Sequence, residues 1–262
     1  MFFKAKKSLG QNFLHSERVV IDMCRRANLD KDKIAVEIGP GKGILTKHLV
    51  EKAGKVISIE KDDRLIEDLH ENFKEHINSE TLNIVHGDAL EFNPSDHELK
   101  AGEYKVVANI PYYITGAFFR QFLSADAHPD SITVLIQKEV AERIMARDNK
   151  ESILSIAVKA YGEPWFVCPV GRECFRPAPN VDSAVLHIER ISKKTFKDNQ
   201  ISEDYFFEIL KKGFGHKRKR LGGNLEIPDD VLHACELDPN VRAEELSIRH
   251  WVALCKEMQS RG

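Results

Sequence analysis

The sequence lacks long hydrophobic runs and has few residues in metal-binding or disulfide patterns. No stretch approaches the roughly 18 apolar residues of a membrane-spanning helix, and the first residues lack the apolar core of a signal peptide. The five cysteines are odd in number and show no CxxC spacing, and the eleven histidines show no metal-ligand spacing. We therefore expect a cytoplasmic protein with free thiols and no bound metal.

A strong excess of one charge is also lacking, since the formal net charge is only -2. The basic residues are nevertheless clustered. Clusters of this kind bind nucleic-acid phosphates whatever the overall charge, although they are also typical of an ordinary solvated surface. One cluster is N-terminal and the other lies near the C-terminus, each without an interrupting acid: Lys4, Lys6 and Lys7, and Lys211, Lys212, Lys217, Arg218, Lys219 and Arg220.

Apolar runs of strand length alternate with helical patterns over the first two thirds of the chain. This alternation favours a parallel, doubly wound sheet. The predicted strands are 34–38, 56–59, 82–85, 106–110 and 132–136. The predicted helices are 44–53, 63–75, 116–123, 139–145 and 152–161.

Two further strand candidates, 165–170 and 184–188, follow without a crossover helix between them. A final antiparallel hairpin of this kind is associated with methyltransferases and not with dinucleotide dehydrogenases. Residues 193–202 are polar and typical of a linker, and the sequence from Glu203 onward predicts helices only. We predict an α/β fold, a Rossmann-like methyltransferase sheet within residues 1–192, and a small all-helical domain at 200–262.

A glycine turn follows the first predicted strand at Gly39, Gly41 and Gly43. Glycines permit a tight turn and a close approach of a ligand to helix N-terminal amides. The spacing is G-x-G-x-G and not the G-x-G-x-x-G of dinucleotide folds, which weakens a nicotinamide interpretation. A glycine turn alone remains a weak signal.

Acids end the next two predicted strands. Glu60 is placed where a carboxylate accepts hydrogen bonds from both ribose hydroxyls of an adenosyl group. Asp88, within Gly87-Asp88-Ala89, is placed to accept an adenine amine, although Asp is equally suited to a turn or helix cap. These acids and the glycine turn together predict an adenosyl-binding crevice.

The fourth predicted strand ends in Asn109-Ile110-Pro111-Tyr112. An Asn amide oxygen and a backbone carbonyl held before proline can accept both hydrogens of an aromatic amine, and a tyrosine offers a face for stacking. Alone, the same residues are also consistent with an ordinary strand-to-loop turn. Beside an adenosyl crevice, they favour methyl transfer to the exocyclic amine of a nucleobase.

Together these motifs resemble the ribosomal RNA adenine N6,N6-dimethyltransferases over nearly the whole chain. The resemblance also covers the segments 7–14, 137–141 and 175–185. It implies that S-adenosylmethionine is held by Gln11, Asn12, Leu14, Gly39, Gly41, Gly43, Glu60, Lys61, Asp88, Ala89 and Asn109. It further implies that segment 11–14 closes over the cofactor and that Tyr112 and Phe175 enclose the target adenine.

The resemblance implies dimethylation of two adjacent adenosines in the 3'-terminal hairpin loop of 16S rRNA, within a pre-30S or 30S particle. Lys217, Arg218 and Arg220 would then contact RNA from a C-terminal helix, although Gly215 and His216 depart from that helix pattern. We expect a monomer. Two alternatives remain: the related methylation of large-subunit rRNA, and a non-catalytic RNA-binding factor. The Phe175 to Val185 segment favours small-subunit rRNA over the first, and the intact Glu60, Asp88 and Asn109 to Tyr112 argue against the second.

Overall fold

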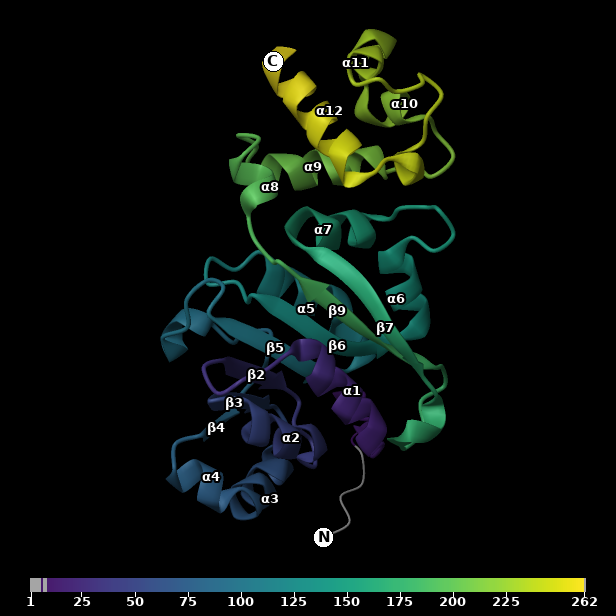
Figure 1. The fold of residues 1–262 in the computed structure, drawn as a ribbon. Helices are drawn as coiled ribbons and strands as arrows, with labels where there is room; N and C mark the ends of the chain where they lie inside the picture. The colour runs from purple at the N-terminus through teal and green to yellow at the C-terminus, as the bar shows by residue number, and fades with distance from the viewer. Residues whose placement is uncertain (1–5, 7–8, 262) are drawn as a thin grey trace. The chain divides into compact units, whose positions relative to one another are not determined.

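A computed structural model describes residue 6 and residues 9–261; Lys4, Lys7 and Ser8 of the N-terminal motif lie outside these residues. The central feature is a seven-stranded sheet in the order β4-β3-β2-β5-β6-β9-β7 (Figure 1). A second sheet has two strands, β1 and β8. Among the described residues, no helix combines the length and apolarity needed to cross a membrane.

The first five strands of the large sheet are parallel, as the alternation of patterns predicts. β2 (Ile34–Ile38) lies between β3 (Lys55–Glu60) and β5 (Tyr104–Asn109), while β4 (Leu82–His86) and β6 (Ser131–Gln137) extend the sheet outward. β9 (Ser183–Glu189) then pairs antiparallel with β6, and β7 (Glu163–Val170) forms the edge next to it. All seven predicted strands and the reversal of direction at the end of the sheet are therefore confirmed.

Helices connect the parallel strands, and the central strands are buried because helices cover a doubly wound sheet. Val36, Val106 and Leu135 are fully buried. Helix α1 (Glu17–Ala27) turns Val20, Met23 and Cys24 into the core that contains Leu135. The other helices that precede β7 along the chain are α2 (Ile44–Lys52), α3 (Asp63–Asn72), α4 (Lys74–Asn78), α5 (Thr115–Leu123), α6 (Lys138–Met145) and α7 (Ile153–Tyr161).

The predicted single helix at 63–75 is wrong in one respect. Helix α3 ends at Asn72, and α4 begins at Lys74 after a break at Phe73, whose φ of -116° and ψ of 21° are not helical. The ring of Phe73 lies against the glycine turn, at the place where a side chain on Gly43 would stand. Packing of one aromatic ring thus accompanies the break, and no local pattern indicates it.

The two-stranded sheet joins segments far apart in the sequence. β1 (Phe13–Leu14) pairs antiparallel with β8 (Phe175–Arg176), so that Leu14 lies opposite Phe175. The His15 amide also donates to the Cys174 carbonyl at 2.9 Å. The N-terminal segment is therefore attached to the segment that carries one of the predicted target-binding residues.

The chain divides into two compact units with a break between Ile191 and Ser192, close to the predicted boundary, but residues 142–164 also belong to the second unit. The first unit contains the residues up to Ala141 and Trp165–Ile191, and the second contains Glu142–Pro164 and the chain from Ser192 onward. Helix α7 belongs with the C-terminal helices because it packs on α8 (Lys194–Lys197), α9 (Glu203–Gly213) and α12 (Ile248–Arg261). The predicted linker also contains Phe196, which is buried against Tyr161 with ring centroids 5.1 Å apart.

The expected basic helix is wrong for residues 214–220, which form a loop between α9 and α10 (Leu221–Leu225). Gly213 ends α9 close to Trp251, where an added Cβ would be 2.4 Å from the indole ring. The Asn224 side chain then donates to the carbonyls of Gly213 and His216 at 2.6 and 3.1 Å. These bonds satisfy carbonyl groups at the helix end, which stabilises the turn. Helix α11 (Asp229–Ala234) follows.

Candidate active site

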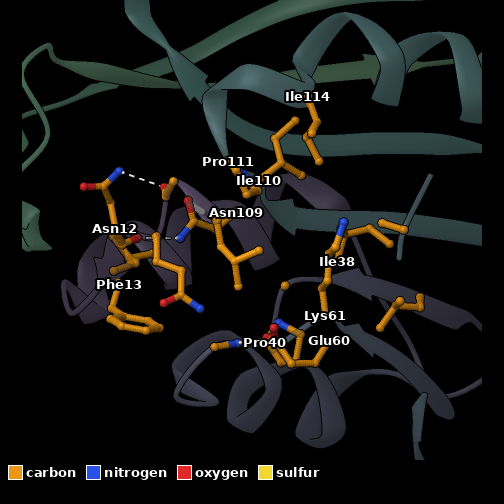
Figure 2. Close-up of a pocket in the computed structure, with 18 of the residues that line it drawn as sticks. Asn12, Phe13, Ile38, Pro40, Glu60, Lys61, Asn109, Ile110, Pro111 and Ile114 are labelled. Carbon is orange, nitrogen blue, oxygen red and sulfur yellow. Dashed lines mark hydrogen bonds between the residues drawn. The ribbon is translucent and has the colours of Figure 1, made fainter. Parts of the chain in front are cut away.

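A cavity of about 290 Å³ lies in the first unit, at the carboxyl ends of the parallel strands. This is where open α/β sheets bind ligands. Figure 2 shows Asn109 beside Asn12, with Glu60 and Pro40 together on another wall. The cavity is lined by these predicted site residues: Gln11, Asn12, Leu14, Gly39, Gly41, Glu60, Lys61, Asp88, Ala89, Asn109, Ile110, Pro111, Tyr112 and Phe175.

The glycine turn forms one wall of the cavity. Gly41 has a φ of 59°, and an added Cβ would lie 3.2 Å from the Phe13 ring, so that only glycine suits this approach. Gly43 differs from the expectation because it is absent from the cavity lining. Its φ is 81°, and an added Cβ would lie 2.5 Å from the Phe73 ring. Gly43 therefore begins helix α2 and accommodates Phe73.

Glu60 ends β3 and is 6% exposed. Its carboxylate accepts hydrogen bonds from the amides of Gly41 and Asp62 at 3.0 and 2.8 Å. Burial raises the pKa of Glu60, and these amides oppose that rise. Each carboxylate oxygen has a second lone pair, so Glu60 can still accept hydrogen bonds from the hydroxyl groups of a ligand.

A second buried acid, Glu37, lies behind the glycine turn. Thr46 and Ser58 donate to its Oε2 at 2.8 and 2.6 Å, while Oε1 is buried without a hydrogen-bond partner in the described part of the chain. Burial raises the pKa of Glu37 to about 7. The carboxyl group therefore changes its charge near neutral pH.

Asp88 makes the turn bond that the sequence suggests for it, and its other oxygen binds a lysine. Its Oδ1 accepts the Leu90 amide at 3.0 Å, which is the predicted turn bond. Its Oδ2 lies 2.5 Å from Lys61 Nζ, and this hydrogen bond lowers the pKa of Asp88. A ligand amine would therefore share this carboxylate with Lys61.

Asn109 is oriented by the N-terminal segment. Its Nδ2 donates to the Asn12 carbonyl at 3.4 Å (Figure 2). The Asn12 side chain donates in turn to the Gly10 carbonyl at 3.2 Å. With the amide nitrogen of Asn109 used in this way, its Oδ1 is left as an acceptor beside the Ile110-Pro111 backbone.

Two aromatic residues, Tyr112 and Phe175, line the cavity together with Asn109 and Ile110. The Tyr112 hydroxyl lies 2.7 Å from Ser183 Oγ at the start of β9, and burial raises the pKa of Tyr112. Phe175 is only 2% exposed and is held in β8 opposite Leu14. Both rings are thus fixed by elements distant in sequence, which suits a planar ligand that must be held in one orientation.

Several residues of the site were missed at the level of sequence. Ser183 holds Tyr112, and Phe13 packs on Gly41 while Lys42 lies 5.2 Å from its ring. Asp62, two residues beyond Glu60, binds Lys6 and Gln11. Phe13 and Ser183 lie in segments that the resemblance covers, and Asp62 is close to Glu60 in sequence, but no local pattern indicates their contacts.

The predicted RNA-binding residues lie in the second unit. Lys217, Arg218 and Arg220 are exposed in the loop between α9 and α10. Arg220 Nη1 lies 3.4 Å from Asn240 Oδ1, within reach of a long hydrogen bond. Their exposure leaves the charges accessible to a polyanion.

Comparison with known proteins identifies relatives over almost the full length. The sequence is 39% identical to "Ribosomal RNA small subunit methyltransferase A" of Dehalococcoides mccartyi, with 97% of this chain and 88% of the relative covered. It is 37% identical to the protein of the same name from Fusobacterium nucleatum, and both chains are covered completely.

Solved structures give the same result for the fold. A dimethyladenosine transferase from Plasmodium falciparum matches with a TM-score of 0.82 and 25% identity, over 95% of this chain and 98% of that chain. The 23S rRNA methyltransferase ErmE matches with a TM-score of 0.76 at 23% identity, over 95% of this chain and all of that chain, which shows the shared fold. The family model "Ribosomal RNA adenine dimethylase" matches residues 2–260, and the chain belongs to this family.

Proposed function

We propose that the protein transfers methyl groups from S-adenosylmethionine to the N6 atoms of two adjacent adenosines in the 3'-terminal hairpin loop of 16S rRNA. Each adenosine receives two methyl groups, within a small-subunit particle. The observation that carries this proposal is the orientation of Asn109, whose amide nitrogen is bound by Asn12 in the same cavity as Glu60. Membership of the family and the small-subunit methyltransferase relatives support it.

The donor set of the cavity suits an adenosyl ligand. Glu60 would accept hydrogen bonds from the ribose hydroxyls. Asp88 would accept a hydrogen bond from the adenine amine, either together with the bond from Lys61 or in its place. The absence of a side chain at Gly41 lets a ligand approach the turn closely. When bound, S-adenosylmethionine supplies an electrophilic methyl group on a sulfonium.

The reaction requires the adenine amine to become a nucleophile. The N6 lone pair is delocalised into the ring, so acceptors must hold the amine hydrogens in a tetrahedral arrangement. Asn109 Oδ1 and the Ile110 carbonyl would accept these hydrogens and stabilise the positive charge that develops on N6. Tyr112 and Phe175 would orient the ring. The proton can leave to water after transfer, so the proposal assigns no general base.

The target base must leave its stack to enter the cavity. Unstacking costs a few kcal/mol, and less in a loop than in a duplex, which favours a hairpin-loop substrate. Lys217, Arg218 and Arg220 would hold the RNA through its phosphates, because RNA is recognised largely by shape and backbone. The cavity belongs to the first unit of the chain, and residues 214–220, which we call the basic loop, belong to the second.

The test uses small and large ribosomal subunits that lack the modification. Both are incubated together with the protein and radiolabelled S-adenosylmethionine, and labelled positions are mapped by reverse-transcriptase stops. We expect label at two adjacent adenosines of the 3'-terminal hairpin of 16S rRNA. Label in large-subunit RNA would favour the related activity, and no label in either RNA would favour a non-catalytic factor.

A further inference from the structure

Asp62 is a fully buried carboxylate that the methyl-transfer reaction does not use. Its Oδ1 accepts from Arg64 Nε at 2.9 Å, and its Oδ2 accepts from Arg64 Nη2 at 2.6 Å. Asp62 also precedes helix α3 as its N-cap and accepts the Arg64 amide at 3.3 Å. These local bonds satisfy part of the carboxylate and explain why an acid is tolerated there.

The remaining partners of Asp62 come from the other end of the chain. We define the N-terminal strap as Lys6 together with residues 9–14. Gln11 Nε2 donates to Asp62 Oδ2 at 2.7 Å, and Lys6 Nζ lies 3.0 Å from Oδ1. The Lys6 amide also donates to Gln11 Oε1 at 2.8 Å, so that the two strap residues are held to each other. These bonds lower the pKa of Asp62, after the larger effect of Arg64.

Asp62 is also bonded directly to the predicted ribose-binding residue. The Asp62 amide donates to Glu60 Oε1 at 2.8 Å. The strap residues from Leu9 to Leu14 all line the cavity. Asp62 is therefore hydrogen-bonded both to the strap that lines the cavity and to the carboxylate that would hold the adenosyl ribose.

The C-terminal end of the strap contacts Asn109 and the strand that contains Phe175. The Asn12 carbonyl binds Asn109, and strand β1 pairs with β8, which contains Phe175. Displacing the strap would remove the hydrogen bonds that Gln11 and Lys6 donate to Asp62. It would also break the bond between Asn109 and Asn12 and the pairing of β1 with β8. Removing partners from a buried charge is unfavourable, so Asp62 favours the closed strap.

We propose that Asp62 is a positioning residue that anchors the N-terminal strap over the cofactor cavity and couples cofactor binding to the segment that carries Phe175. This inference rests on the proposed function, because it takes the cavity to be the S-adenosylmethionine site. The coupling runs through the hydrogen bonds from Glu60 to Asp62 and from Asp62 to Gln11, along the backbone from Gln11 to β1, and across the ladder between β1 and β8.

Two variants test the anchor from its two sides. Asp62→Asn keeps an N-cap residue for α3 but removes the charge. Gln11→Leu removes the strap partner and leaves the Asp62 bonds to Arg64 in place. The matched control is Asp63→Asn, since Asp63 is an exposed acid 3.2 Å from the same Lys6 amine and is absent from the cavity lining.

The measurements are S-adenosylhomocysteine affinity by calorimetry, steady-state methyl transfer, and amide hydrogen exchange of residues 9–14 and 175–176. We expect Asp62→Asn and Gln11→Leu to raise Kd and the KM for S-adenosylmethionine about tenfold, with kcat changed less than about threefold, and Asp63→Asn to resemble wild type. In wild type, the ligand should protect both segments; in the two variants, protection of 175–176 should be lost.

The outcomes separate this inference from the proposed function. If the wild-type protein does not bind S-adenosylhomocysteine, the proposed cofactor site is wrong. If wild type binds it and both variants bind within twofold of wild type with unchanged exchange, the anchor is wrong. A large loss of kcat with unchanged Kd would likewise overturn the anchor, because it would place Asp62 in the chemical step.

Discussion

At the scale of single residues, the site depends on amide and carboxyl groups whose orientation is fixed by backbone partners. Asn109 is oriented through Asn12, and Glu60 through the amides of Gly41 and Asp62. The sequence was sufficient to predict that both residues end strands beside one crevice, because each strand has a recognisable apolar pattern. It could not predict Asn12 as a partner of Asn109, because no local pattern links positions so far apart.

Replacing Asn109 with alanine tests the acceptor role of its amide oxygen. We expect Asn109→Ala to lower the single-turnover rate of methyl transfer by about 100-fold to 1,000-fold, the usual effect of removing one group that stabilises developing charge. Affinity for S-adenosylhomocysteine should change far less, since Glu60 and Asp88 remain. Single-turnover transfer to unmethylated small subunits measures the first quantity, and calorimetry measures the second. A variant with nearly normal single-turnover rates would show that Asn109 does not hold the amine.

Glu37 should make the unfolding free energy depend on pH. Its pKa is about 7 in the folded protein and near 4.5 when unfolded, so the folded state binds the proton more tightly. The stability that Glu37 contributes is fully present below the pKa of the unfolded state, and it is lost as the pH rises through the pKa of the folded state. Glu37→Gln removes this loss, and its advantage over wild type should be about 2 kcal/mol larger at pH 8.5 than at pH 5.5.

The Glu37→Gln comparison uses urea unfolding without ligand, at both pH values and for both proteins. Taking the difference between variant and wild type cancels the titration of the other acids. An advantage that is independent of pH would contradict the assignment of a near-neutral pKa to this carboxyl.

At the scale of elements, strands and helices were predictable wherever the sequence carries a period. Each of the seven strands of the large sheet coincides with an apolar run in the sequence. The ladder between β1 and β8 could not be predicted, because two-residue strands have no period and their pairing spans most of the chain. The break at Phe73 accompanies packing of its ring on Gly43, and the loop at 214–220 accompanies hydrogen bonds from the Asn224 side chain to the carbonyls of Gly213 and His216. Neither contact has a periodic pattern in the sequence, so both features were missed.

The start of helix α2 gives a direct test of element packing. Gly43→Ala should destabilise the protein by about 1 to 3 kcal/mol, because the position has a φ of 81° and a Cβ would lie 2.5 Å from Phe73. Gly116→Ala is the matched control. Gly116 is in helix α5, nothing lies within 4 Å of an added Cβ, and the change should be neutral or stabilising by up to about 1 kcal/mol. Urea unfolding compares them; equal stability of both variants would contradict the packing argument.

At the scale of the whole molecule, the two units divide the predicted roles. The cavity belongs to the first unit and the exposed basic loop to the second. The existence of a helical C-terminal part was predictable from its composition, but the membership of residues 142–164 was not. That segment carries an ordinary helical pattern, and only its packing against α8, α9 and α12 assigns it to the second unit.

Reversing two charges in the basic loop tests the contribution of the second unit. We expect Arg218→Glu with Arg220→Glu to weaken binding to a 16S hairpin fragment and to reduce its salt dependence by about one unit of slope per lost phosphate contact. Affinity for S-adenosylhomocysteine should not change. A double reversal at the exposed Lys55 and Lys100 alters net charge equally and should affect RNA binding less. Equal RNA affinity of wild type and the Arg218/Arg220 variant would contradict the role.

The most direct test of the central claim is mass spectrometry of 16S rRNA after reaction of unmethylated small subunits with the protein and S-adenosylmethionine. The 3'-terminal hairpin fragment should gain two methyl groups on each of two adjacent adenosines, recovered as N6,N6-dimethyladenosine, and the Asn109→Ala protein should leave nearly all of the fragment unmodified at the same reaction time. Methylation at another base or atom, or an unmodified fragment with the wild-type protein, would contradict the proposed function.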